Sequence, residues 1–296
     1  MADEPTGAAH RTGVFRAGDQ VQLTDPKGRH HTFTLVSGKQ FHTHKGAIDH
    51  DSLIGGPEGV LVTSTGSTTY LALRPLLSDF VLSMPRGATV VYPKDAGQIV
   101  AQADLFPGAH VIEAGVGSGA LTCSLLRAVG DAGLVSSYER RADFAEIARA
   151  NVEAFFGAAH PGWTLTVGDL VERLAEEPPG RPVDRVVLDM LAPWECVGAV
   201  AEVMAPGGVF CSYVATTTQL SRLVETLRTH TGFTEPQANE TIMRGWHVEG
   251  LAVRPEHRMI GHTGFLVTSR RLAAGVVAPT RRRRPAKGAY GDDWSA

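Results

Sequence analysis

The spacing of hydrophobic residues over the first 73 positions predicts short β-strands. Apolar and β-branched residues alternate with polar ones at residues 21–25, 31–36 and 59–66. This period of two is typical of half-buried strands, and the stretches between them contain the Gly, Pro and Ser residues that form turns. No helical period interrupts the pattern, so we expect residues 1–73 to form a small all-β domain.

From Arg74 onward, helical periods alternate with nearly continuous apolar runs. The helical periods predict helices over residues 75–84, 94–105, 120–129, 142–157, 193–204 and 218–232, with Pro206-Gly207-Gly208 and Gly232 ending the last two. The apolar runs predict strands at residues 109–115, 133–139, 164–169, 184–190, 209–215 and 264–272. This order is typical of a doubly wound, mostly parallel sheet, and we therefore predict an α/β domain over residues 74–275.

Composition and charge narrow the class of protein without identifying it. The 296 residues are 43% hydrophobic and 20% charged, with a formal net charge of -3. These values are ordinary for a globular protein, and the length suffices for one large domain or for one large and one small domain. The chain begins with a polar, acidic segment and has no apolar run of about 18 residues, so we predict no signal peptide and no membrane contact. Three widely spaced cysteines without CxxC spacing fit a reducing, cytoplasmic location.

Two local clusters of basic residues leave alternatives open. Between Glu256 and Asp292 the chain has no acidic residue, and Arg281–Arg284 follow one another. Residues 276–296 form either a solvated basic extension or an arm that contacts nucleic acid. The two histidines of residues 42–44 would share one face of a strand. Exposed histidines or RNA contacts are commoner there than a metal site, and we predict no metal.

The stretch EAGVGSG, residues 113–119, follows a predicted strand and precedes a predicted helix. Glycines at such a turn let the backbone approach a ligand without interference from a Cβ atom, as in nucleotide-binding α/β folds. The loop alone does not distinguish a nicotinamide dinucleotide, whose pyrophosphate binds at the helix N-terminus, from other nucleotide-like cofactors.

Acidic residues at the ends of three predicted strands favour a cationic ligand. Glu139, Asp169 and Asp189 follow the second, third and fourth strands, and the carboxyl ends of such strands meet at one crevice. Glu139 suits the two hydroxyls of a ribose. Further carboxylates attract the sulfonium and ammonium groups of S-adenosylmethionine and repel a pyrophosphate. Arg140 and Arg141 are the counter-evidence, because arginine at this place can accept the 2′-phosphate of NADP.

Several longer stretches resemble a known enzyme family. EAGVGSG, YERR, GD and DMLAPW follow one another as in class I S-adenosylmethionine-dependent methyltransferases, which have a Rossmann-like, seven-stranded sheet. The stretches PRGATVVYPKDAGQIV and GWHVEGLAVRPEHRMIGHTGFL, with the N-terminal β-domain, more narrowly resemble the tRNA (adenine-58-N1)-methyltransferases of bacteria and archaea. The resemblance implies a homotetramer that needs no metal. It also implies methyl transfer from S-adenosylmethionine to N1 of adenine 58 in the T-loop of tRNA, leaving S-adenosylhomocysteine.

The same resemblance assigns roles around the methyl donor. The glycine loop passes under the methionine and ribose parts of the donor, through Gly115, Gly117, Ser118 and Gly119. Glu139 binds the ribose hydroxyls, and Asp169 takes the adenine amino group with Leu170 beside the ring. The remaining donor-binding positions are Gln98, Glu113, Val116, Ala120, Leu121, Arg140 and Phe144.

Asp189 and Tyr92 are the implied catalytic residues. Asp189 faces the ammonium end of the donor and the target base, and Tyr92 lines the pocket for that base. N1 of adenine carries an in-plane lone pair and attacks the methyl group directly, so a carboxylate beside the exocyclic amine stabilises the developing positive charge. Ala192 replaces the acidic residue that often precedes the Pro193-Trp194 pair in this family, which leaves the placement of that pair around the base open.

Three other functions stay open from the sequence. A class I methyltransferase that acts on a protein, of the isoaspartyl type, or on a small molecule shares much of the loop and acid pattern. A non-catalytic tRNA-binding subunit is expected to lack the glycine loop and Asp189, and this chain retains both. A nicotinamide-dependent oxidoreductase remains because of Arg140 and Arg141.

Overall fold

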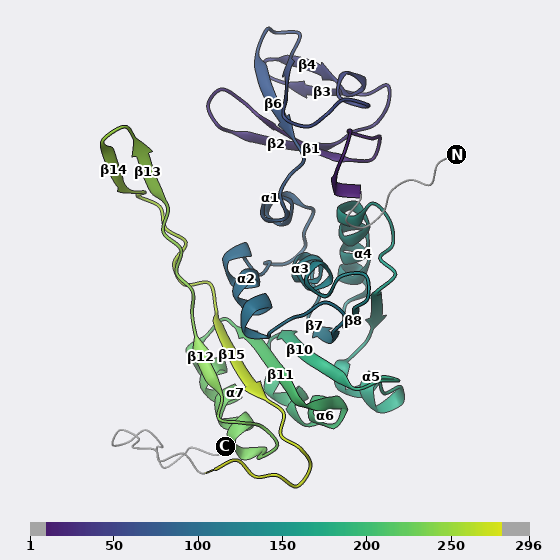
Figure 1. Ribbon diagram of the computed structural model, residues 1–296, viewed down its shortest axis with the longest axis vertical. Coiled ribbons are helices and arrows are strands. Elements are labelled where there is room, and N and C mark those ends of the chain that lie inside the picture. Colours follow the sequence, from purple (N-terminus) through teal and green to yellow (C-terminus); the bar gives the residue numbers. More distant parts are fainter. Residues whose placement is uncertain (1–9, 280–296) are drawn as a thin grey trace.

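The computed structural model describes residues 10–279, and a small antiparallel β-domain stands at one end of it (Figure 1). Its elements are β1 (Gln20–Thr24), β2 (His30–Thr34), β3 (Gln40–Thr43), β4 (Gly46–Asp49), the 3-10 turn η2 (His50–Ser52), β5 (Val60–Thr63) and β6 (Thr69–Leu73). Four strands form a sheet in the order β2-β1-β6-β5, and β3 pairs with β4. The all-β N-terminal domain predicted from the sequence is confirmed.

This β-domain has a hydrophobic core of its own. Val21 and Leu23 of β1 pack with Tyr70 and Ala72 of β6, and all four are at most 2% exposed. None of these side chains belongs to the core clusters around the larger sheet. The domain is therefore held together mainly by its own buried apolar surface.

A seven-stranded, mostly parallel sheet forms the centre of the larger domain, as predicted. Its strands are β7 (His110–Ala114), β8 (Leu134–Glu139), β9 (Trp163–Val167), β10 (Val183–Asp189), β11 (Met204–Val214), β12 (Gln237–Asn239) and β15 (Phe265–Arg270). Their order is β12-β15-β11-β10-β7-β8-β9, and β15 runs antiparallel to both of its neighbours. The chain order reverses between β7 and β10, which opens a crevice at their carboxyl ends.

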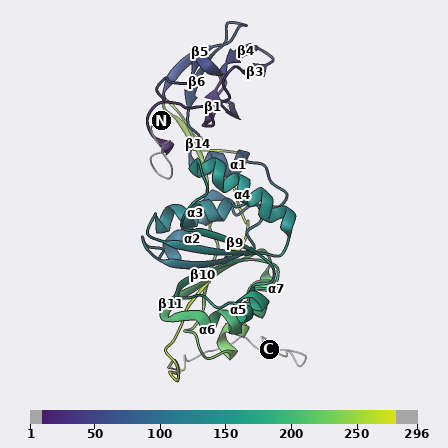
Figure 2. The ribbon, with the colours of Figure 1, turned by 90° about the vertical axis from the view of Figure 1, so that its right-hand side faces the viewer.

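Helices cover both faces of this sheet (Figure 2). The face nearer the β-domain carries α1 (Leu77–Ser83), α2 (Pro93–Gln102), α3 (Ala120–Val129) and α4 (Ala142–Phe156). The other face carries α5 (Leu170–Glu176), α6 (Val197–Val203), which follows the 3-10 turn η3 (Pro193–Cys196), and α7 (Thr217–Thr229). A capping box between Thr216 and Gln219 begins α7. No helix within residues 10–279 is long and apolar enough to cross a bilayer.

Helices α2 and α7 end three residues earlier than predicted, α1, α4 and α6 end one residue earlier, and α5 was not predicted. Helix α6 stops at Val203, and Pro206-Gly207-Gly208 lies within β11, where Gly207 has a φ of +83° and strand pairing shifts register. Helix α7 stops at Thr229 because Thr231 has a left-handed φ of +59°. Helix α5 has only seven residues, too few for its apolar period to stand out.

A two-stranded arm projects from the edge of the sheet on the side of the β-domain (Figure 1). It consists of β13 (Trp246–Glu249) and β14 (Ala252–Pro255), which lie between β12 and β15 along the chain and pair with each other in antiparallel fashion. Pairing places Trp246, Val248 and Val253 on one face, and these side chains are 56%, 68% and 57% exposed. The sequence did not predict this arm, because its four-residue strands alternate too briefly to be recognised.

Candidate active site

A cavity of 880 Å³ opens at the carboxyl ends of the central strands. The glycine loop after β7, the ends of β8, β10 and β11, residues 88–92 and residues 262–263 form its walls. The predicted site residues in its lining are Tyr92, Gly115, Val116, Gly117, Ser118, Ala120, Leu121, Glu139, Arg140, Phe144, Leu170 and Asp189. The other predicted residues stand outside that lining, namely Gln98, Glu113, Gly119 and Asp169.

Gly115 brings the glycine loop against the end of β10. Its φ of +84° lies in the left-handed region, and an added Cβ atom would stand 1.8 Å from the backbone oxygen of Asp189. No side chain tolerates that approach, so this packing requires glycine. The contact places Asp189 directly beside the loop that is predicted to carry the donor.

Glu139 is buried and held by two backbone N–H groups. The N–H of Gly117 donates to Oε2 and the N–H of Arg141 donates to Oε1, each at 3.0 Å. A carboxylate offers about four acceptor positions. Each oxygen of Glu139 therefore keeps capacity for a further donor, such as a ribose hydroxyl, while its orientation is fixed.

Asp189 presents a carboxylate without a partner to the cavity. Within residues 10–279 its side chain makes no hydrogen bond and no ion pair. Burial raises the pKa of Asp189 to about 7, and the negative charge of Glu139 adds to the shift. Both effects disfavour the anion in the absence of a ligand, so a cation placed beside the two carboxylates would be strongly attracted.

These residues fit a cationic nucleoside better than a pyrophosphate. Two carboxylates face the cavity, and the Ser118 hydroxyl in the glycine loop is buried with no partner in the described part of the chain. A Cβ atom at Gly117 would meet nothing within 4 Å, so the loop is open to a ligand there. Leu170 and Phe144 add apolar surface for a base. Among residues 10–279, no group of three or more His, Cys, Asp or Glu has a metal-binding arrangement.

Arg140 is paired with Asp169. Its Nε donates to Asp169 Oδ2 at 2.8 Å, and its Nη2 binds the same oxygen. Asp169 Oδ1 accepts hydrogen bonds from the N–H groups of Val171 and Glu172, so Asp169 is the N-cap of α5. This ion pair neutralises the guanidinium of Arg140, which from the sequence was a possible ligand for the 2′-phosphate of NADP. The contact of Asp169 with the donor adenine stays a prediction.

Glu113 and Gln98 do not line the cavity. Glu113 is 1% exposed and accepts hydrogen bonds from the hydroxyls of Thr122 and Ser137 at 2.6–3.0 Å. Burial raises the pKa of Glu113 to about 7. The carboxyl group joins β7 to α3 and β8, and so supports the glycine loop from beneath. Gln98 accepts a hydrogen bond from Gln102, and contact of either residue with the donor stays a prediction.

A buried ion pair beside Tyr92 was missed by sequence reasoning. Lys94 Nζ donates to Asp95 Oδ1 at 2.8 Å and to Thr263 Oγ1 at 2.6 Å. The Thr263 hydroxyl donates to Asp95 Oδ2 at 2.6 Å, and the Tyr213 hydroxyl donates to the same oxygen at 3.4 Å. The network joins the YPKD and HTGF stretches and holds Thr263 and Tyr213 in the cavity wall. The adjacent opposite charges of Lys94 and Asp95 in the YPKD stretch were the signal from which this ion pair could have been predicted.

His262 and Gln219 complete this side of the cavity. His262 Nδ1 lies 2.9 Å from Glu240 Oε2, and Nε2 lies 3.0 Å from the Ala215 oxygen. The hydrogen bond to Glu240 raises the pKa of His262. Gln219 Nε2 donates to the Leu191 oxygen at 2.9 Å. Both side chains come from beyond β11. His262 lies in the HTGF stretch that carried the family resemblance, but neither residue was predicted to belong to the site.

Trp194 lies outside the cavity lining. The Arg222 guanidinium carbon stands 4.4 Å from the centre of its ring, a cation–π contact, and the ring packs against the core beneath α7. Of Tyr92 and Trp194, which the family resemblance places near the target base, Tyr92 lines the cavity and Trp194 does not.

Solved structures define the class of this fold. An S-adenosylmethionine-dependent O-methyltransferase from Thermotoga maritima matches with a TM-score of 0.80 and 29% identity, over 92% of this chain and 97% of that one. A tRNA (m1A58) methyltransferase from Aquifex aeolicus matches with a TM-score of 0.73 and 24% identity, over 88% and 99%. The fold is that of the Rossmann-like methyltransferases, and the cavity lies at the place where such folds bind ligands.

Sequence comparison narrows this class to one family. A family model described as tRNA methyltransferase complex GCD14 subunit matches residues 70–253, and a TrmI-like N-terminal model matches residues 13–62. The tRNA (adenine(58)-N(1))-methyltransferase TrmI of Thermus thermophilus is 39% identical over 253 residues, 85% of this chain and 96% of that protein. The tRNA (adenine(57)-N(1)/adenine(58)-N(1))-methyltransferase TrmI of Methanocaldococcus jannaschii is 32% identical over 84% of this chain and 93% of that protein. The chain belongs to this family of tRNA methyltransferases.

Proposed function

We propose that this protein transfers the methyl group of S-adenosylmethionine to N1 of adenine 58 in tRNA. The proposal is carried by the two carboxylates in the cavity: Asp189, which has no partner within residues 10–279, and Glu139, which two backbone N–H groups hold in place. Family membership and 39% identity to the Thermus enzyme support the choice of substrate.

The residues around the glycine loop would hold the donor. When bound, S-adenosylmethionine supplies a methyl group on a positively charged sulfur. Glu139 would accept hydrogen bonds from the ribose hydroxyls, and Asp189 would attract the cationic methionine end. Leu170 and Phe144 would border the adenine ring, since both line the same cavity. The loop itself leaves room because Gly115 and Gly117 carry no side chain.

Asp189 is also the residue that we propose acts on the target base. Its carboxylate would accept a hydrogen bond from the exocyclic amine of adenine, and that bond strengthens as positive charge develops on the ring. Tyr92 and Tyr213 line the cavity on the side of the YPKD and HTGF stretches and would orient the base. Alignment of the reacting atoms alone contributes roughly 7–11 kcal/mol.

The decisive experiment locates the methyl group in tRNA. We expect the purified protein, given labelled S-adenosylmethionine and an unmodified tRNA transcript, to form 1-methyladenosine at position 58. Matched transcripts that replace adenine at position 57 or at position 58 separate the two sites, and loss of label is expected only for the latter. Label that enters a peptide or small molecule while tRNA stays unlabelled would overturn the proposal.

We further propose that four copies assemble through the arm. One face of the β13–β14 hairpin exposes Trp246, Val248 and Val253, and an isolated apolar hairpin in water is unusual unless a partner covers it. Light scattering should report about four times the 31.5 kDa chain mass. The substitution Val248→Asp should lower that mass, whereas His247→Asp on the opposite face should not. A monomeric wild-type protein would refute the assembly.

Location and domain roles follow the same proposal. A tRNA-modifying enzyme of this kind would work in the cytoplasm. Residues 1–73 would grip tRNA or another copy, residues 74–275 would carry catalysis, and residues 276–296 would form a basic tail. The separate core of the β-domain and the two family models support this division. Most of the tail, including Arg281–Arg284, lies outside the described residues.

A further inference from the structure

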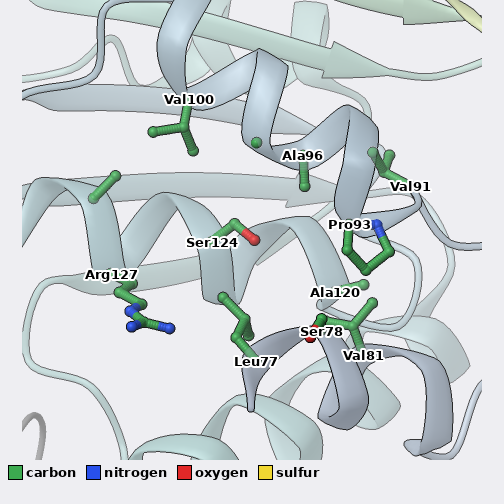
Figure 3. A pocket seen from close by; sticks show the side chains of 12 residues that line it. Leu77, Ser78, Val81, Val91, Pro93, Ala96, Val100, Ala120, Ser124 and Arg127 are labelled. Atoms are coloured by element: carbon green, nitrogen blue, oxygen red, sulfur yellow. The ribbon is translucent and has the colours of Figure 1, made fainter. Parts of the chain in front are cut away.

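Three neighbouring openings follow α3 from the candidate active site to the junction with the β-domain. The catalytic cavity shares Val91 and Ala120 with a groove between α1, α2 and α3 (Figure 3). That groove shares Leu77, Ser78 and Arg127 with a cleft of 440 Å³ at the domain junction. Ala120 and Arg127 are seven residues apart on α3, so the cavity and the cleft are separated by about 10 Å along the helix axis.

The cleft at the domain junction holds more positive charge than the chain neutralises. The charge of Arg74 is neutralised, because its two terminal nitrogens bind Asp19 at 2.5 Å and Glu58 at 2.6 Å. Arg11 donates to a backbone oxygen and forms no ion pair, and exposed Arg127 has no hydrogen bond or ion pair within residues 10–279. In the described part of the chain, these two guanidinium groups therefore line one cleft without an ion pair, since Glu58 in the same cleft is paired with Arg74.

Arg127 also has a structural role at the end of α3, and this role does not extend to Arg11. A cation in the last turn of α3 stabilises the helix dipole. Arg11 lies over the ring of Phe155, with its guanidinium carbon 4.2 Å from the ring centre, and its pKa is lowered first by burial and then by repulsion from Arg127 and Arg74. An anion bound between Arg11 and Arg127 would remove this repulsion.

The groove between the cleft and the cavity has a different chemistry. Leu77, Val81 and Val100 form apolar walls, and Ser124 and Arg127 project into it from α3 (Figure 3). Phosphate would be poorly solvated on such a surface, whereas a base or ribose packs on it favourably. The order along α3 is therefore a cavity for a base, an apolar groove and a site for an anion.

We propose that this path binds the tRNA strand next to the target adenosine, with a backbone phosphate at Arg11 and Arg127 and sugar or base surface in the groove. Arginine guanidinium groups match phosphate oxygens in geometry and charge. The inference rests on the proposed function and adds the route by which tRNA leaves the catalytic cavity. It also gives a reason for the position of the β-domain, since Arg11 and Glu58 form one side of the cleft.

The test compares R127Q with R181Q in tRNA binding by the full-length protein at several salt concentrations. Arg181 is also exposed, but it lies just before the amino end of β10, whereas the cavity lies at the carboxyl end of that strand. Each phosphate contact contributes about 0.7–0.9 to the slope of log affinity against log salt. Raising salt from about 50 to 200 mM should therefore weaken wild type and R181Q about threefold more than R127Q.

Further measurements keep the outcomes distinct. We expect R127E to lower kcat/KM for tRNA more than R127Q does, with S-adenosylhomocysteine affinity unchanged in both. Equal salt slopes for R127Q, R181Q and wild type would overturn the inference. The inference would also be overturned if R127Q changed the particle mass of the protein but not its salt slope for tRNA binding, because the groove would then be a contact between copies. A wild-type protein that leaves tRNA unmethylated contradicts the proposed function itself.

Discussion

Replacing Asp189 with Asn should lower methylation of tRNA by a factor of about 10²–10⁴. The substitution keeps the size of the side chain and removes the charge that faces the cavity, where it has no partner among residues 10–279. Attraction for the cationic donor and stabilisation of charge on the target base are both lost. Labelled methyl transfer measures the loss of tRNA methylation. The affinity of the variant for tRNA should stay near that of the wild type. Unchanged turnover would remove Asp189 from the mechanism.

The pH dependence of this reaction provides an internal control. Because the pKa of Asp189 is raised to about 7, kcat/KM for the donor should fall about tenfold per pH unit below that value and level off above it. The Asn variant should lose this slope. A slope that persists in the variant would assign the titration to Glu113, whose pKa is also about 7.

Stability separates lost chemistry from lost folding in the same variant. An acid whose pKa is raised in the folded state destabilises that state as pH rises from its unfolded pKa toward about 7. At neutral pH without ligand, the Asn variant should therefore melt a few degrees above wild type. A lower melting temperature would mean that the activity loss reports damage to the fold.

Replacing Gly115 with Ala should abolish donor binding and destabilise the protein by about 2–4 kcal/mol. The new Cβ atom would stand 1.8 Å from the backbone oxygen of Asp189 and 2.7 Å from its carbonyl carbon. Strands β7 and β10 would have to separate where the two carboxylates approach the loop. Calorimetric titration with S-adenosylhomocysteine and denaturant unfolding measure the two effects.

Gly108 offers a matched control for the conformation of Gly115. Its φ of +92° is close to the +84° of Gly115, but a Cβ atom there would meet nothing within 4 Å. The substitution Gly108→Ala should cost only about 1–2 kcal/mol of backbone strain and leave donor binding intact. Equal effects at both positions would show that strain, rather than the contact with Asp189, explains the requirement for glycine.

Local patterns in the sequence carried much of the candidate site. The glycine loop and the strand-end residues Glu139 and Asp189 were recognisable because each depends on its own strand and on the rule that parallel strands end at one crevice. Asp169 follows the same rule, yet its carboxylate caps α5 and pairs with Arg140. A charge at the right place in the sequence does not reveal which neighbour it will bind.

Contacts between distant segments explain what the sequence did not predict. Lys94, Asp95 and Thr263 form one network although 168 positions separate Asp95 from Thr263, and no local period encodes such a pairing. The arm was missed because its strands have only four residues each, too few for an alternating pattern to be recognised. The strand after α6 was predicted to begin at residue 209 but begins at Met204, because Gly207, expected to end the helix, instead lies at a register shift in β11.

The sequence by itself determined the alternation of strands and helices, the separate β-domain and the acidic rim of the crevice, because hydrophobic period and turn chemistry are local properties. Only the tertiary structure decided that the Asp189 carboxylate has no partner within residues 10–279, that Asp169 is engaged, and that Arg11 and Arg127 line the same cleft at the domain junction. Those outcomes depend on which side chains folding brings within a few ångströms, and burial then sets their charge and their availability to a ligand.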